Sequence, residues 1–502
     1  MTNPDATAQR RALALQDAAR LNAKVLVDGQ LREGAGGATF EVENPADLSI
    51  AGHAARCGKA DVDRAVQAAL RAQPAWAALA ARERGKLLAR AADRLEAETD
   101  RLAALLCLET GNAFTTQARP EVGTAVDTLR LFAGLAGELK GRTIPWPGGV
   151  HCYTTRDPWG VVGAIIPWNA PLFLTACKSG PALVAGNTIV LKTAEQAPLA
   201  ALRMGEILQE VLPPGVINII SGFGEEAGQP LVEHPGVHKI TFTGSSTVGQ
   251  IILRHAADKI APVTLELGGK SPNVVLPDAD LDRVVPGILQ GMRFTRQGQS
   301  CSAGTRLLLH ESIHDEVVAR VVKALAKMRV GDPMDEASEV GAIISAEQYE
   351  RVNHYVEMAR ATPGARIACG GGRPAGDAVA RGYFYAPTLI EGVPHASPVC
   401  QDEIFGPVAV TVRWRDFDEA IALANDTRFG LAASVWTRDL AKALAFVDRV
   451  KAGFVQVNQY ITPQPNLPYG GLKMSGLGKE NTLEAMLEHF TCSKTVLINP
   501  GA

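Results

Sequence analysis

Several features that mark other classes of protein are missing from this sequence of 502 residues. Gly, Pro or Asn interrupts the apolar runs, GVVGAIIPW and GPALVAGNTIVL among them, well short of the length that spans a membrane. The opening MTNPDATAQRRALALQDAARLNAK is charged and amphipathic, without the apolar core of a secretory signal. The formal net charge is only -3, so nothing favours nucleic acid or an anionic membrane surface as a partner. We therefore expect a cytoplasmic enzyme.

Metal-binding patterns are also scarce. The eight cysteines are scattered without a C-x-x-C pair, which in a long chain indicates reduced thiols and neither disulfides nor a zinc ribbon. The run His310-Glu311-Ser312-Ile313-His314 matches H-E-x-x-H, a zinc pattern that needs both histidines on one face of a helix. RLLLH before it is typical of a strand, and Ser312 with Asp315 is typical of a helix N-cap. The helix would then begin between the histidines, so we expect no metal site.

The sequence does contain a regular alternation of strand and helix patterns. Residues 58–138 are rich in Ala, Leu and Arg with an apolar period of 3.6 residues, which predicts helices. From residue 161, short β-branched runs alternate with helical ones, and a second alternating series begins at residue 271 and ends with FVQVNQ. This spacing predicts an α/β fold with two parallel-sheet lobes in tandem. Ligands would bind at the carboxyl ends of the strands and between the lobes.

Two strand-like segments fit neither lobe. RTIPWPGGVHCYTTRDPWG (142–160) and HFTCSKTVLINP (489–500) are bounded by Pro and Gly and lie far apart in the chain. They could pair as a small protruding sheet, and apolar edge strands exposed in that way usually meet another subunit. Ordinary surface hairpins are the alternative. We favour an oligomerisation arm in a homodimer or homotetramer.

One cysteine and one glutamate have neighbours that suit chemistry on a carbonyl group. Cys301 ends the run Gly298-Gln299-Ser300-Cys301, and Glu266 lies in Leu265-Glu266-Leu267-Gly268-Gly269-Lys270. The glycines allow the backbone to approach both side chains closely. A thiolate can attack a carbonyl carbon, and a carboxylate can later activate water against the covalent intermediate. The two residues therefore predict covalent catalysis by a nucleophile and a base.

Seven runs, in order along the chain, resemble those of the NAD(P)-dependent aldehyde dehydrogenase superfamily. The resemblance extends from about Gly29 to Asn499. One run alone would be a weak signal, but all of them in the family's order and spacing make a chance match negligible. The runs are Ile166-Pro167-Trp168-Asn169, Leu191-Lys192-Thr193-Ala194-Glu195, Phe242-Thr243-Gly244-Ser245, the Glu266 run, the Cys301 run, Glu403-Ile404-Phe405-Gly406-Pro407, and Pro468-Tyr469-Gly470-Gly471-Leu472-Lys473-Met474-Ser475-Gly476.

The resemblance implies that an aldehyde is oxidised to a carboxylic acid while NAD is reduced. Cys301 would attack the aldehyde to give a thiohemiacetal, loss of hydride would leave a thioester, and Glu266 would activate the water that releases the acid. The side-chain amide of Asn169 and the backbone N–H of Cys301 would form the oxyanion hole. Lys178 and Glu480 match family positions that pass protons to and from the base.

Each of these residues also has a purely structural interpretation. Glu266 could be a buried, hydrogen-bonded carboxylate at a turn, and Asn169 could cap the helix that follows it, with or without a catalytic role. Lys178 alone is typical of a helix lysine that reaches to solvent, and Glu480 of a surface charge. Because the runs occur together, we favour catalytic roles for Cys301, Glu266 and Asn169. Both interpretations stay open for Lys178 and Glu480.

Two rival functions share this fold. In a CoA-acylating semialdehyde dehydrogenase, CoA replaces water, and the retained Glu266 argues against it because thiol attack needs no water-activating base. A catalytically inactive binding protein would need a broken site, yet Cys301, Glu266 and Asn169 are all present. We therefore expect the hydrolytic type of enzyme.

The expected cofactor is NAD, with NADP possible. Lys192 and Glu195 match the family's clamp on the adenosine ribose, where a carboxylate would repel a 2′-phosphate. The family often has Pro where this chain has Thr193, which leaves the loop less rigid and weakens the preference. Gly244 and Ser245 form a strand-to-helix turn suited to a pyrophosphate. The other residues that the resemblance assigns to the cofactor are Ile165, Ile166, Trp168, Gly224, Gly228, Thr243, Val248, Leu267, Gly268, Gln348, Arg351, Glu403 and Phe405.

The resemblance also divides the chain into domains. Residues 1–138 and 159–266 would form the NAD-binding domain, a helical region plus a Rossmann-like sheet. Residues 267–482 would form the catalytic domain that carries the nucleophilic cysteine. Residues 139–158 and 483–502 would form the oligomerisation arm.

The sequence does not identify the aldehyde. Ala170 and Thr295 are small where relatives often carry bulky aromatics, which predicts a roomy, mainly apolar funnel, closed at its mouth by the loop 459–467. Medium-chain or aromatic aldehydes would then be better substrates than acetaldehyde. Arg296 would suit a substrate carboxylate, but we expect its side chain to face away into a surface ion pair. The pocket residues expected by position are Ala170, Phe173, Leu174, Cys177, Phe294, Thr295, Ser300, Ser302 and Leu467.

Overall fold

The computed structural model describes residues 4–461 and 464–501. It begins with helix α1 (Pro4–Leu21), followed by two antiparallel pairs of strands. Within the described residues, no helix is both long and apolar enough to cross a membrane. The strands of the two pairs are β1 (Lys24–Val27) with β2 (Gln30–Glu33), and β3 (Thr39–Glu43) with β4 (Ile50–Ala55).

The predicted helical region is confirmed. Its apolar period places one face of each helix in the core, as in α3, where Leu88, Ala91, Ala92 and Leu95 are buried. The helices are α2 (Lys59–Ala78), α3 (Ala81–Ala97), α4 (Thr99–Thr110), η1 (Phe114–Ala118), α5 (Arg119–Gly134) and η2 (Leu135–Glu138).

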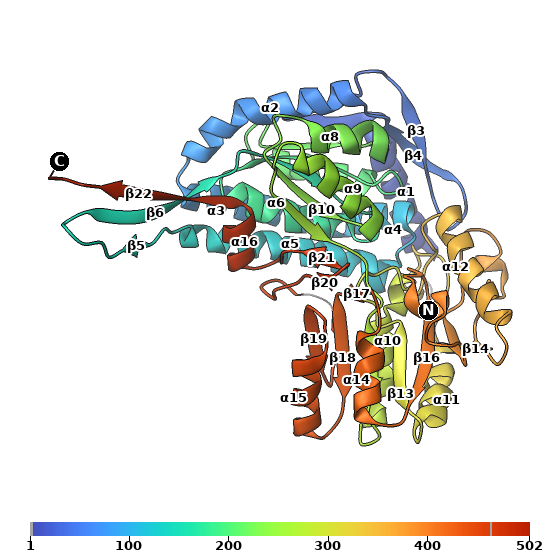
Figure 1. Ribbon diagram of the computed structural model, residues 1–502. Coiled ribbons are helices and arrows are strands. Elements are labelled where there is room, and N and C mark those ends of the chain that lie inside the picture. The colour runs from blue at the N-terminus through green and yellow to red at the C-terminus, as the bar shows by residue number, and fades with distance from the viewer. Residues whose placement is uncertain (1–3, 462–463, 502) are drawn as a thin grey trace.

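The first lobe is built on a sheet in the order β2-β1-β9-β8-β7-β10-β11-β21. Its five strands from β9 to β11 are parallel, and every residue of β8 and β10 is buried because helices cover both faces (Figure 1). Its elements are β7 (Val161–Ile165), α6 (Pro171–Val184), β8 (Thr188–Lys192), α7 (Leu199–Gln209), β9 (Ile217–Ile220), η3 (Gly224–Gly228), α8 (Gln229–Glu233), β10 (Lys239–Thr243), α9 (Ser246–Ala257) and β11 (Val263–Glu266).

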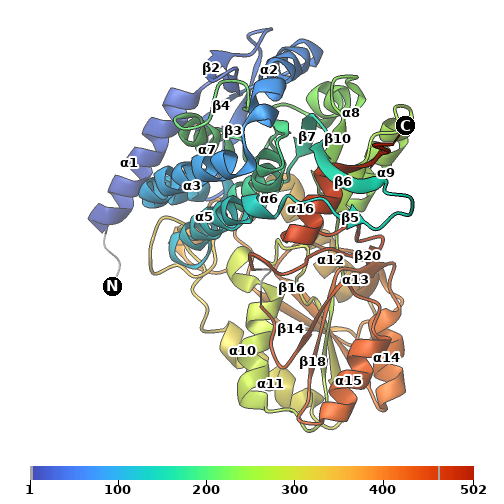
Figure 2. The same cartoon turned by 90° about the vertical axis from the view of Figure 1, so that its left-hand side faces the viewer.

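The second lobe has a seven-stranded sheet in the order β14-β15-β16-β13-β12-β18-β19, parallel except for β14. Helices α10 and α11 lie on one side of it and α14 and α15 on the other (Figure 2). Its elements are β12 (Pro272–Val275), α10 (Leu281–Met292), η4 (Phe294–Arg296), β13 (Arg306–His310), α11 (His314–Leu325), α12 (Ala346–Arg360), β14 (Arg366–Cys369), η5 (Asp377–Val379), β15 (Thr388–Glu391), α13 (Pro398–Gln401), β16 (Val408–Trp414), α14 (Phe417–Asn425), β17 (Phe429–Gly430), β18 (Ala432–Trp436), α15 (Leu440–Arg449) and β19 (Phe454–Val457). The two predicted parallel-sheet lobes are confirmed.

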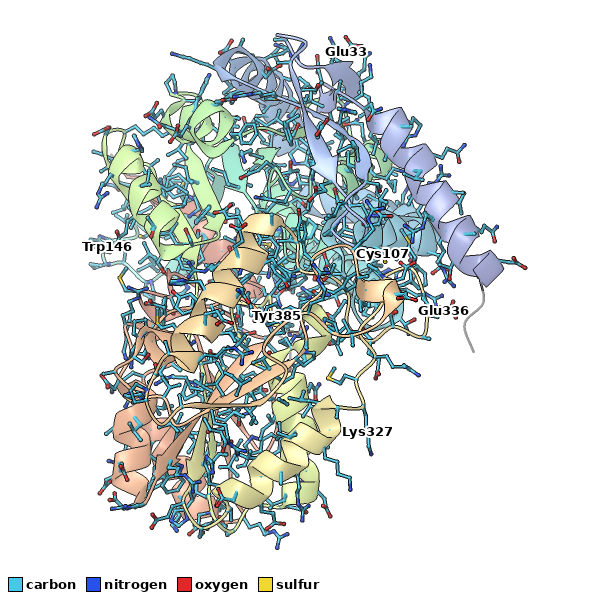
Figure 3. The ribbon with its side chains drawn as sticks, turned by 90° about the vertical axis from the view of Figure 1, so that its right-hand side faces the viewer. Glu33, Cys107, Trp146, Lys327, Glu336 and Tyr385 are labelled. Atoms are coloured by element: carbon cyan, nitrogen blue, oxygen red, sulfur yellow. The ribbon has the colours of Figure 1, made fainter. Side chains whose placement is uncertain are left out.

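The predicted pairing of the two orphan segments is also confirmed. Strand β22 (Thr491–Ile498) runs antiparallel to β6 (His151–Pro158), which pairs with β5 (Thr143–Ile144). This three-stranded sheet projects from the body of the molecule (Figure 1). Beside it, the side chain of Trp146 stands at the outer surface, whereas Cys107 and Tyr385 lie within the lobes (Figure 3).

The last part of the chain returns to the first lobe. Strand β20 (Leu472–Lys473) pairs with β17 (Phe429–Gly430) of the second lobe, but β21 (Gly476–Leu477) pairs antiparallel with β11 and forms the edge of the first sheet. Helix α16 (Leu483–His489) follows, and its Met486 packs into the first lobe's core. The chain therefore crosses between the lobes again after the second sheet is complete.

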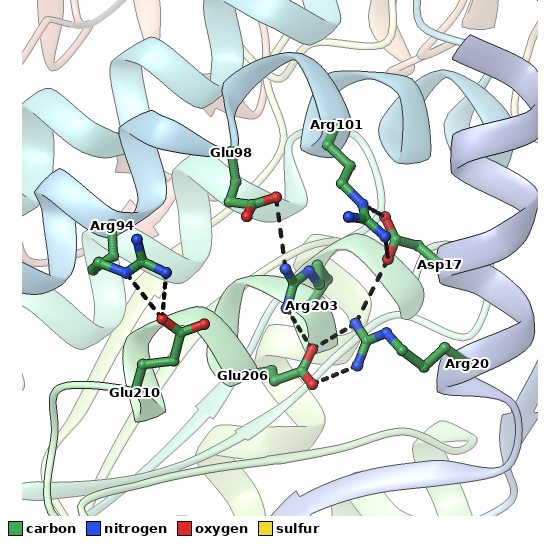
Figure 4. A network of polar contacts seen from close by, with 8 residues as sticks. All are labelled: Asp17, Arg20, Arg94, Glu98, Arg101, Arg203, Glu206 and Glu210. Atoms are coloured by element: carbon green, nitrogen blue, oxygen red, sulfur yellow. Dashed lines mark hydrogen bonds and ion pairs between the residues drawn. The ribbon is translucent and has the colours of Figure 1, made fainter. Parts of the chain in front are cut away.

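A network of ion pairs ties helix α1 to α4 and α7 (Figure 4). The carboxylate of Asp17 is almost fully buried and accepts hydrogen bonds from the guanidinium of Arg101, 2.5 and 2.9 Å away. Arg20 of α1 contacts both Asp17 and Glu206 of α7. Exposed ion pairs contribute little to stability, so the buried carboxylate of Asp17 is the member of this network on which the docking of α1 depends most.

The histidines of the H-E-x-x-H run lie on different elements, as predicted, but the predicted cap is wrong. His310 ends β13, and α11 begins at His314 without a side-chain cap. The hydroxyl of Ser312 instead lies 2.7 Å from Nδ1 of His310. That contact competes with capping because the hydroxyl turns back toward the strand.

Candidate active site

A cavity of about 590 Å³ lies between the two lobes, at the carboxyl ends of β7, β10 and β11. Cys301, Glu266 and Asn169 all line it, as the sequence predicted. The other predicted residues that line it are Trp168, Ala170, Phe173, Leu174, Cys177, Thr243, Gly244, Ser245, Leu267, Gly268, Ser300, Ser302, Gln348, Arg351, Glu403, Phe405 and Glu480.

Cys301, the expected nucleophile, follows η4 on an irregular segment. Burial raises the pKa of its thiol to about 11. The hydroxyl of Tyr469 lies 3.5 Å from its Sγ, and this hydrogen bond lowers the pKa of the thiol. The backbone N–H of Cys301 donates no hydrogen bond to any residue in 4–461 or 464–501. This N–H is therefore available to an incoming oxygen.

Glu266, the expected base, is the last residue of β11 and is paired in register with Thr243. Burial, followed by the negative charge of Glu480, raises the pKa of its carboxyl well above the usual value. Both carboxyl oxygens are buried, and neither has a hydrogen-bond partner among the described residues. Buried polar atoms are nearly always paired, so an unpaired carboxyl that lines a cavity indicates a functional group. The alternative of a hydrogen-bonded turn carboxylate is wrong.

The glycines after Glu266 are required by close contacts across the site. A Cβ at Gly268 would lie 2.1 Å from a carboxylate oxygen of Glu403, and a Cβ at Gly269 would lie 2.4 Å from the backbone oxygen of Cys301. The backbone N–H of Gly269 donates to Glu403 at 3.0 Å. These glycines therefore bring the strand that ends at Glu266 directly against the Cys301 segment.

Asn169 does not cap helix α6, contrary to the structural alternative. The N-cap position is Ala170, and the backbone N–H of Leu172 in the first turn donates to the buried carboxylate of Glu121 at 3.0 Å. The Nδ2 of Asn169 donates instead to the backbone oxygen of Gln299 at 3.0 Å. An amide nitrogen carries two N–H groups, so the second can donate into the cavity. The backbone oxygen of Asn169 accepts from Nη1 of Arg296 at 3.2 Å, which fixes this segment further.

Lys178 and Glu480 form a buried ion pair next to the cavity. The side chain of Lys178 is fully buried, and that of Glu480 is 8% exposed. Glu480 also accepts a hydrogen bond from the hydroxyl of Thr241 at 3.3 Å. The interpretations as a solvent-reaching lysine and a surface charge are therefore wrong. The negative charge of Glu480 raises the pKa of Glu266, and the positive charge of Lys178 lowers it.

The end of the cavity that the resemblance assigns to the cofactor is held by long polar side chains. Nε2 of Gln348 donates to the backbone oxygens of Ile404 and Phe405, and Arg351 donates to that of Glu403 at 2.6 Å. Phe405 has a left-handed backbone, with φ of 59°, and its ring meets Trp168 edge to face. Burial raises the pKa of Glu403 to about 7.

A second group of predicted cofactor residues gathers beyond the central cavity. Nζ of Lys192 lies 3.5 Å from a carboxylate oxygen of Glu195, and a Cβ at Gly228 would meet Lys192 and Ile165 at ordinary contact distance. Ser245 caps α9 by accepting from the backbone N–H of Val248, which confirms the predicted strand-to-helix turn. The predicted cofactor residues that do not line the central cavity are Ile165, Ile166, Lys192, Glu195, Gly224, Gly228 and Val248.

Three of the predicted pocket residues do not line the cavity. Phe294 is fully buried in the core of the second lobe, and the hydroxyl of Thr295 accepts from Gln117 at 2.6 Å. Leu467 also lies away from the wall. The loop 459–467 to which it belongs includes residues 462 and 463, which lie outside the described residues.

The expectation for Arg296 is wrong. Its side chain is only 12% exposed and lines the cavity, where it is paired with the buried Glu121 at 3.3 Å. Its Nε also donates to Gln117 at 2.9 Å. An ion pair of Arg296 was expected at the surface. It lies inside the protein instead, because the buried carboxylate of Glu121 on α5 is its partner.

Several lining residues were missed. Tyr469 lies in one of the seven runs that resemble the family, so its position was available from the sequence. Gln117, Glu121 and Thr124 follow one another at helical spacing along η1 and α5, and this polar stripe on an otherwise apolar face was a usable signal. The missed lining residues are Thr116, Gln117, Pro120, Glu121, Thr124, Pro167, Thr247, Arg293, Arg296, Tyr469 and Asn481.

Known proteins share both this sequence and this fold. A profile described as the aldehyde dehydrogenase family matches residues 31–496. The chain belongs to the aldehyde dehydrogenase family. It is 41% identical to aldehyde dehydrogenase 1A1 of Gallus gallus over 481 residues, which cover 95% of this chain and 93% of that protein. It is therefore an oxidoreductase that acts on the aldehyde group, and the predicted family is confirmed.

Solved aldehyde dehydrogenase structures superpose closely on this one. An NAD+ complex of the Bacillus cereus enzyme is 37% identical, with a TM-score of 0.93, over 97% of this chain and 98% of that one. Betaine aldehyde dehydrogenase of Staphylococcus aureus, also in complex with NAD+, is 34% identical, with a TM-score of 0.94, over 98% of both chains. The predicted α/β fold is thus shared along the whole chain.

Proposed function

We propose that this aldehyde dehydrogenase oxidises its substrate to the carboxylic acid with NAD, by covalent catalysis at Cys301 and hydrolysis by Glu266. The observation that carries this proposal is the shared cavity, in which a thiol and an unpaired carboxyl face the same space. The carboxyl of Glu266 has no hydrogen-bond partner among the described residues. As a base it would activate water for hydrolysis, whereas transfer of the acyl group to CoA needs no such base. The hydrolytic reaction is therefore favoured over the CoA-acylating one.

The chain's own residues suit a nicotinamide dinucleotide. The hydroxyl oxygen of Thr243 is buried without a partner among the described residues and lines the cavity, where a polar ligand atom would satisfy it. The N-terminus of α9 begins at the next residues and favours a phosphate. Glu195 beside Lys192 favours a free ribose hydroxyl over a 2′-phosphate, so NAD is preferred over NADP. The bound nicotinamide would supply a hydride acceptor.

The oxyanion of the thiohemiacetal would be held by two donors. These are the backbone N–H of Cys301 and the second N–H of the Asn169 amide. The backbone oxygen of Gln299 holds the side-chain amide, and Arg296 holds the backbone oxygen of Asn169, so little reorganisation is needed during the reaction.

Glu266 would take a proton from water during hydrolysis of the thioester. Its raised pKa makes the ionised carboxylate a stronger proton acceptor than an ordinary glutamate. The Lys178–Glu480 pair lies next to Glu266. It could exchange that proton with Glu266 and stabilise the charge of its carboxylate. We propose positioning roles for both residues.

Three further expectations accompany this function as proposals. The domain boundaries at residues 138, 158, 266 and 482 are retained as a proposal, with β21 joining the first sheet from within the segment 267–482. The projecting arm would meet a second subunit in a dimer or tetramer. A cytoplasmic location agrees with the cytosolic enzyme of Rattus norvegicus, which is 41% identical over 479 residues.

The test is NADH formation by the purified protein with a panel of aldehydes, each assayed with NAD, NADP and added CoA. We expect NADH from the wild type and none from Cys301→Ala, with NAD favoured over NADP. Turnover by Cys301→Ala equal to the wild type would remove the nucleophile assignment. Formation of acyl-CoA in place of the acid would overturn the hydrolytic route.

A further inference from the structure

Arg293 is the one guanidinium on the cavity wall that has no hydrogen-bond or ion-pair partner among the described residues. Its Nε is buried without a hydrogen bond, and neither terminal nitrogen forms a hydrogen bond or ion pair with any residue in 4–461 or 464–501. Cys301, Tyr469 and Tyr460 lie close enough to raise the pKa of Arg293 when they are ionised, so Arg293 stands on the side of the cavity where the thiol lies.

The backbone explains why this side chain enters the cavity. Arg293 follows the last residue of α10 and has a left-handed conformation, with φ of 57°, and Gln297 beyond η4 has another, with φ of 50°. A non-glycine residue in this region is uncommon and is often found at functional sites. The two reversals place Phe294 in the core and turn Arg293 and Arg296 toward the cavity.

The neighbouring arginine provides an internal comparison. Arg296 is held by the carboxylate of Glu121, the side chain of Gln117 and the backbone oxygen of Asn169. Its charge is already balanced, so it cannot be expected to take up an anion strongly. Arg293 lies three residues earlier with the same chemistry and no such partners. Its positive charge therefore remains uncompensated at the cavity wall.

An uncompensated guanidinium in this environment is unstable. Burial lowers the pKa of Arg293 to about 9, and the positive charge of Arg296 adds to this effect. Arginine is planar, carries five donors and matches a carboxylate in a two-point geometry. A ligand carboxylate would restore the missing hydrogen bonds and the missing charge together.

We propose that the aldehyde substrate carries a carboxylate at its far end and that Arg293 binds it. This inference rests on the proposed function, because the same molecule must present its aldehyde carbon to Cys301. The oxidation would then convert a semialdehyde into a dicarboxylate. One hydride leaves the aldehyde carbon, one water oxygen is added to it, and two protons are released. The chain thus acts on the product of a reaction that generates an aldehyde from a carboxylated precursor.

The inference can be tested with aldehydes of one shape and different charge. 4-Carboxybenzaldehyde is compared with its neutral methyl ester and with 4-formylphenyl phosphate, and 5-oxopentanoate is compared with pentanal for a flexible spacing. Wild type, Arg293→Gln, Arg293→Lys and the control Arg415→Gln are assayed for kcat/KM. Arg415 is exposed on the second lobe and paired with Glu311, far from the cavity wall.

We expect the wild type to prefer the carboxylate over its neutral partner in at least one pair. Arg293→Gln should lower that preference by about 10–100-fold, the range expected for a charge-assisted hydrogen bond. Arg293→Lys should retain part of the preference, and Arg415→Gln all of it. No preference in either pair, or one that Arg293→Gln leaves intact, would overturn the inference. An equal loss on charged and neutral aldehydes would assign Arg293 to Cys301 instead, and a stronger preference for the phosphate would replace the carboxylate.

A failure of the proposed function is distinguishable from a failure of this inference. If the wild type oxidises neutral aldehydes without preferring the carboxylate, only the inference fails. If no aldehyde yields NADH, binding of terephthalate, the expected product of 4-carboxybenzaldehyde, is measured by calorimetry. Binding that Arg293→Gln abolishes would support the anion site without turnover, and equal or absent binding in both proteins would overturn it.

Discussion

The hydroxyl of Tyr469 lies 3.5 Å from Sγ of Cys301, the expected nucleophile, and can donate a hydrogen bond to the thiolate. Burial raises the pKa of that thiol to about 11, so few molecules would carry a thiolate at neutral pH. A donated hydrogen bond stabilises the thiolate more than the thiol, because the negative sulfur is the better acceptor. Tyr469 therefore favours the reactive form of Cys301.

Replacing Tyr469 by Phe should raise the pKa of Cys301 by about one unit, the equivalent of one hydrogen bond to a charged group. Alkylation by iodoacetamide should then slow at pH 8, and the midpoint of its pH profile should move upward. The control is Tyr153→Phe in the arm, where the ring is partly exposed. An unchanged pH profile of alkylation in Tyr469→Phe would contradict this role of the hydroxyl.

Glu266→Gln should separate the two halves of the reaction. Acylation of Cys301 would continue while hydrolysis loses its base, so we expect a burst of NADH followed by a steady rate at least ~100-fold below the wild type. In the wild type, kcat should rise with pH through the raised pKa of Glu266, because only the ionised carboxyl accepts a proton. This rising limb should disappear in the variant. Stopped-flow absorbance measures both effects, and the absence of a burst would place the slow step elsewhere.

Gly269→Ala should damage the site more than the fold. The new Cβ would lie 2.4 Å from the backbone oxygen of Cys301, which must move away. Displacement of a reacting group by about 1 Å can lower the rate ~100-fold, whereas overpacking costs about 1–3 kcal/mol of stability. Gly123→Ala is the matched control, because its Cβ would meet nothing within 4 Å on helix α5. Equal activity of the two variants would contradict the close approach.

Lys178→Met should destabilise the protein and alter its pH profile. Breaking a buried ion pair leaves Glu480 without its cation, which typically costs about 3–5 kcal/mol in the free energy of unfolding. The positive charge of Lys178 also lowers the pKa of Glu266, so its loss should move the rising limb of kcat to higher pH. Urea denaturation and the pH profile of kcat measure the two effects. Lys86→Met, at an exposed ion pair, should change neither.

Removal of residues 490–502 should disrupt the proposed assembly. This truncation deletes β22 and leaves β6 with an unpaired edge. The control truncation removes only residues 499–502 and keeps β22 intact. Light scattering should report a smaller mass for the first protein and the full mass for the second. An unchanged mass after the longer truncation would count against the arm.

The alternation of strands and helices could be predicted from the sequence because each element obeys a local rule. The apolar period of α3 and the continuous burial of β8 and β10 are properties of short segments. The pairing of β22 with β6 followed from two segments that had no other partner. The resemblance to the aldehyde dehydrogenase family then implied that Cys301, Glu266 and Asn169 share one site, and all three line the cavity.

The errors arose where one backbone angle or one distant neighbour decides the outcome. Left-handed conformations at Arg293 and Gln297 determine which side chains around η4 face the cavity, and no periodic pattern reveals such reversals. Hence Phe294 was placed in the pocket and Arg293 was overlooked. Asn169 has the right composition for a cap, but the backbone oxygen of Gln299 competes for its amide.

Strand β21 has a consequence for how the protein is made. During synthesis, β11 emerges with Glu266 at its end while its antiparallel neighbour is still far from being translated. The first sheet therefore lacks its edge strand β21, and β11 stays unpaired on that side, until the whole second sheet has left the ribosome. An open strand edge is a template for pairing with other chains. The nascent enzyme is thus exposed to aggregation at the strand that carries its expected base.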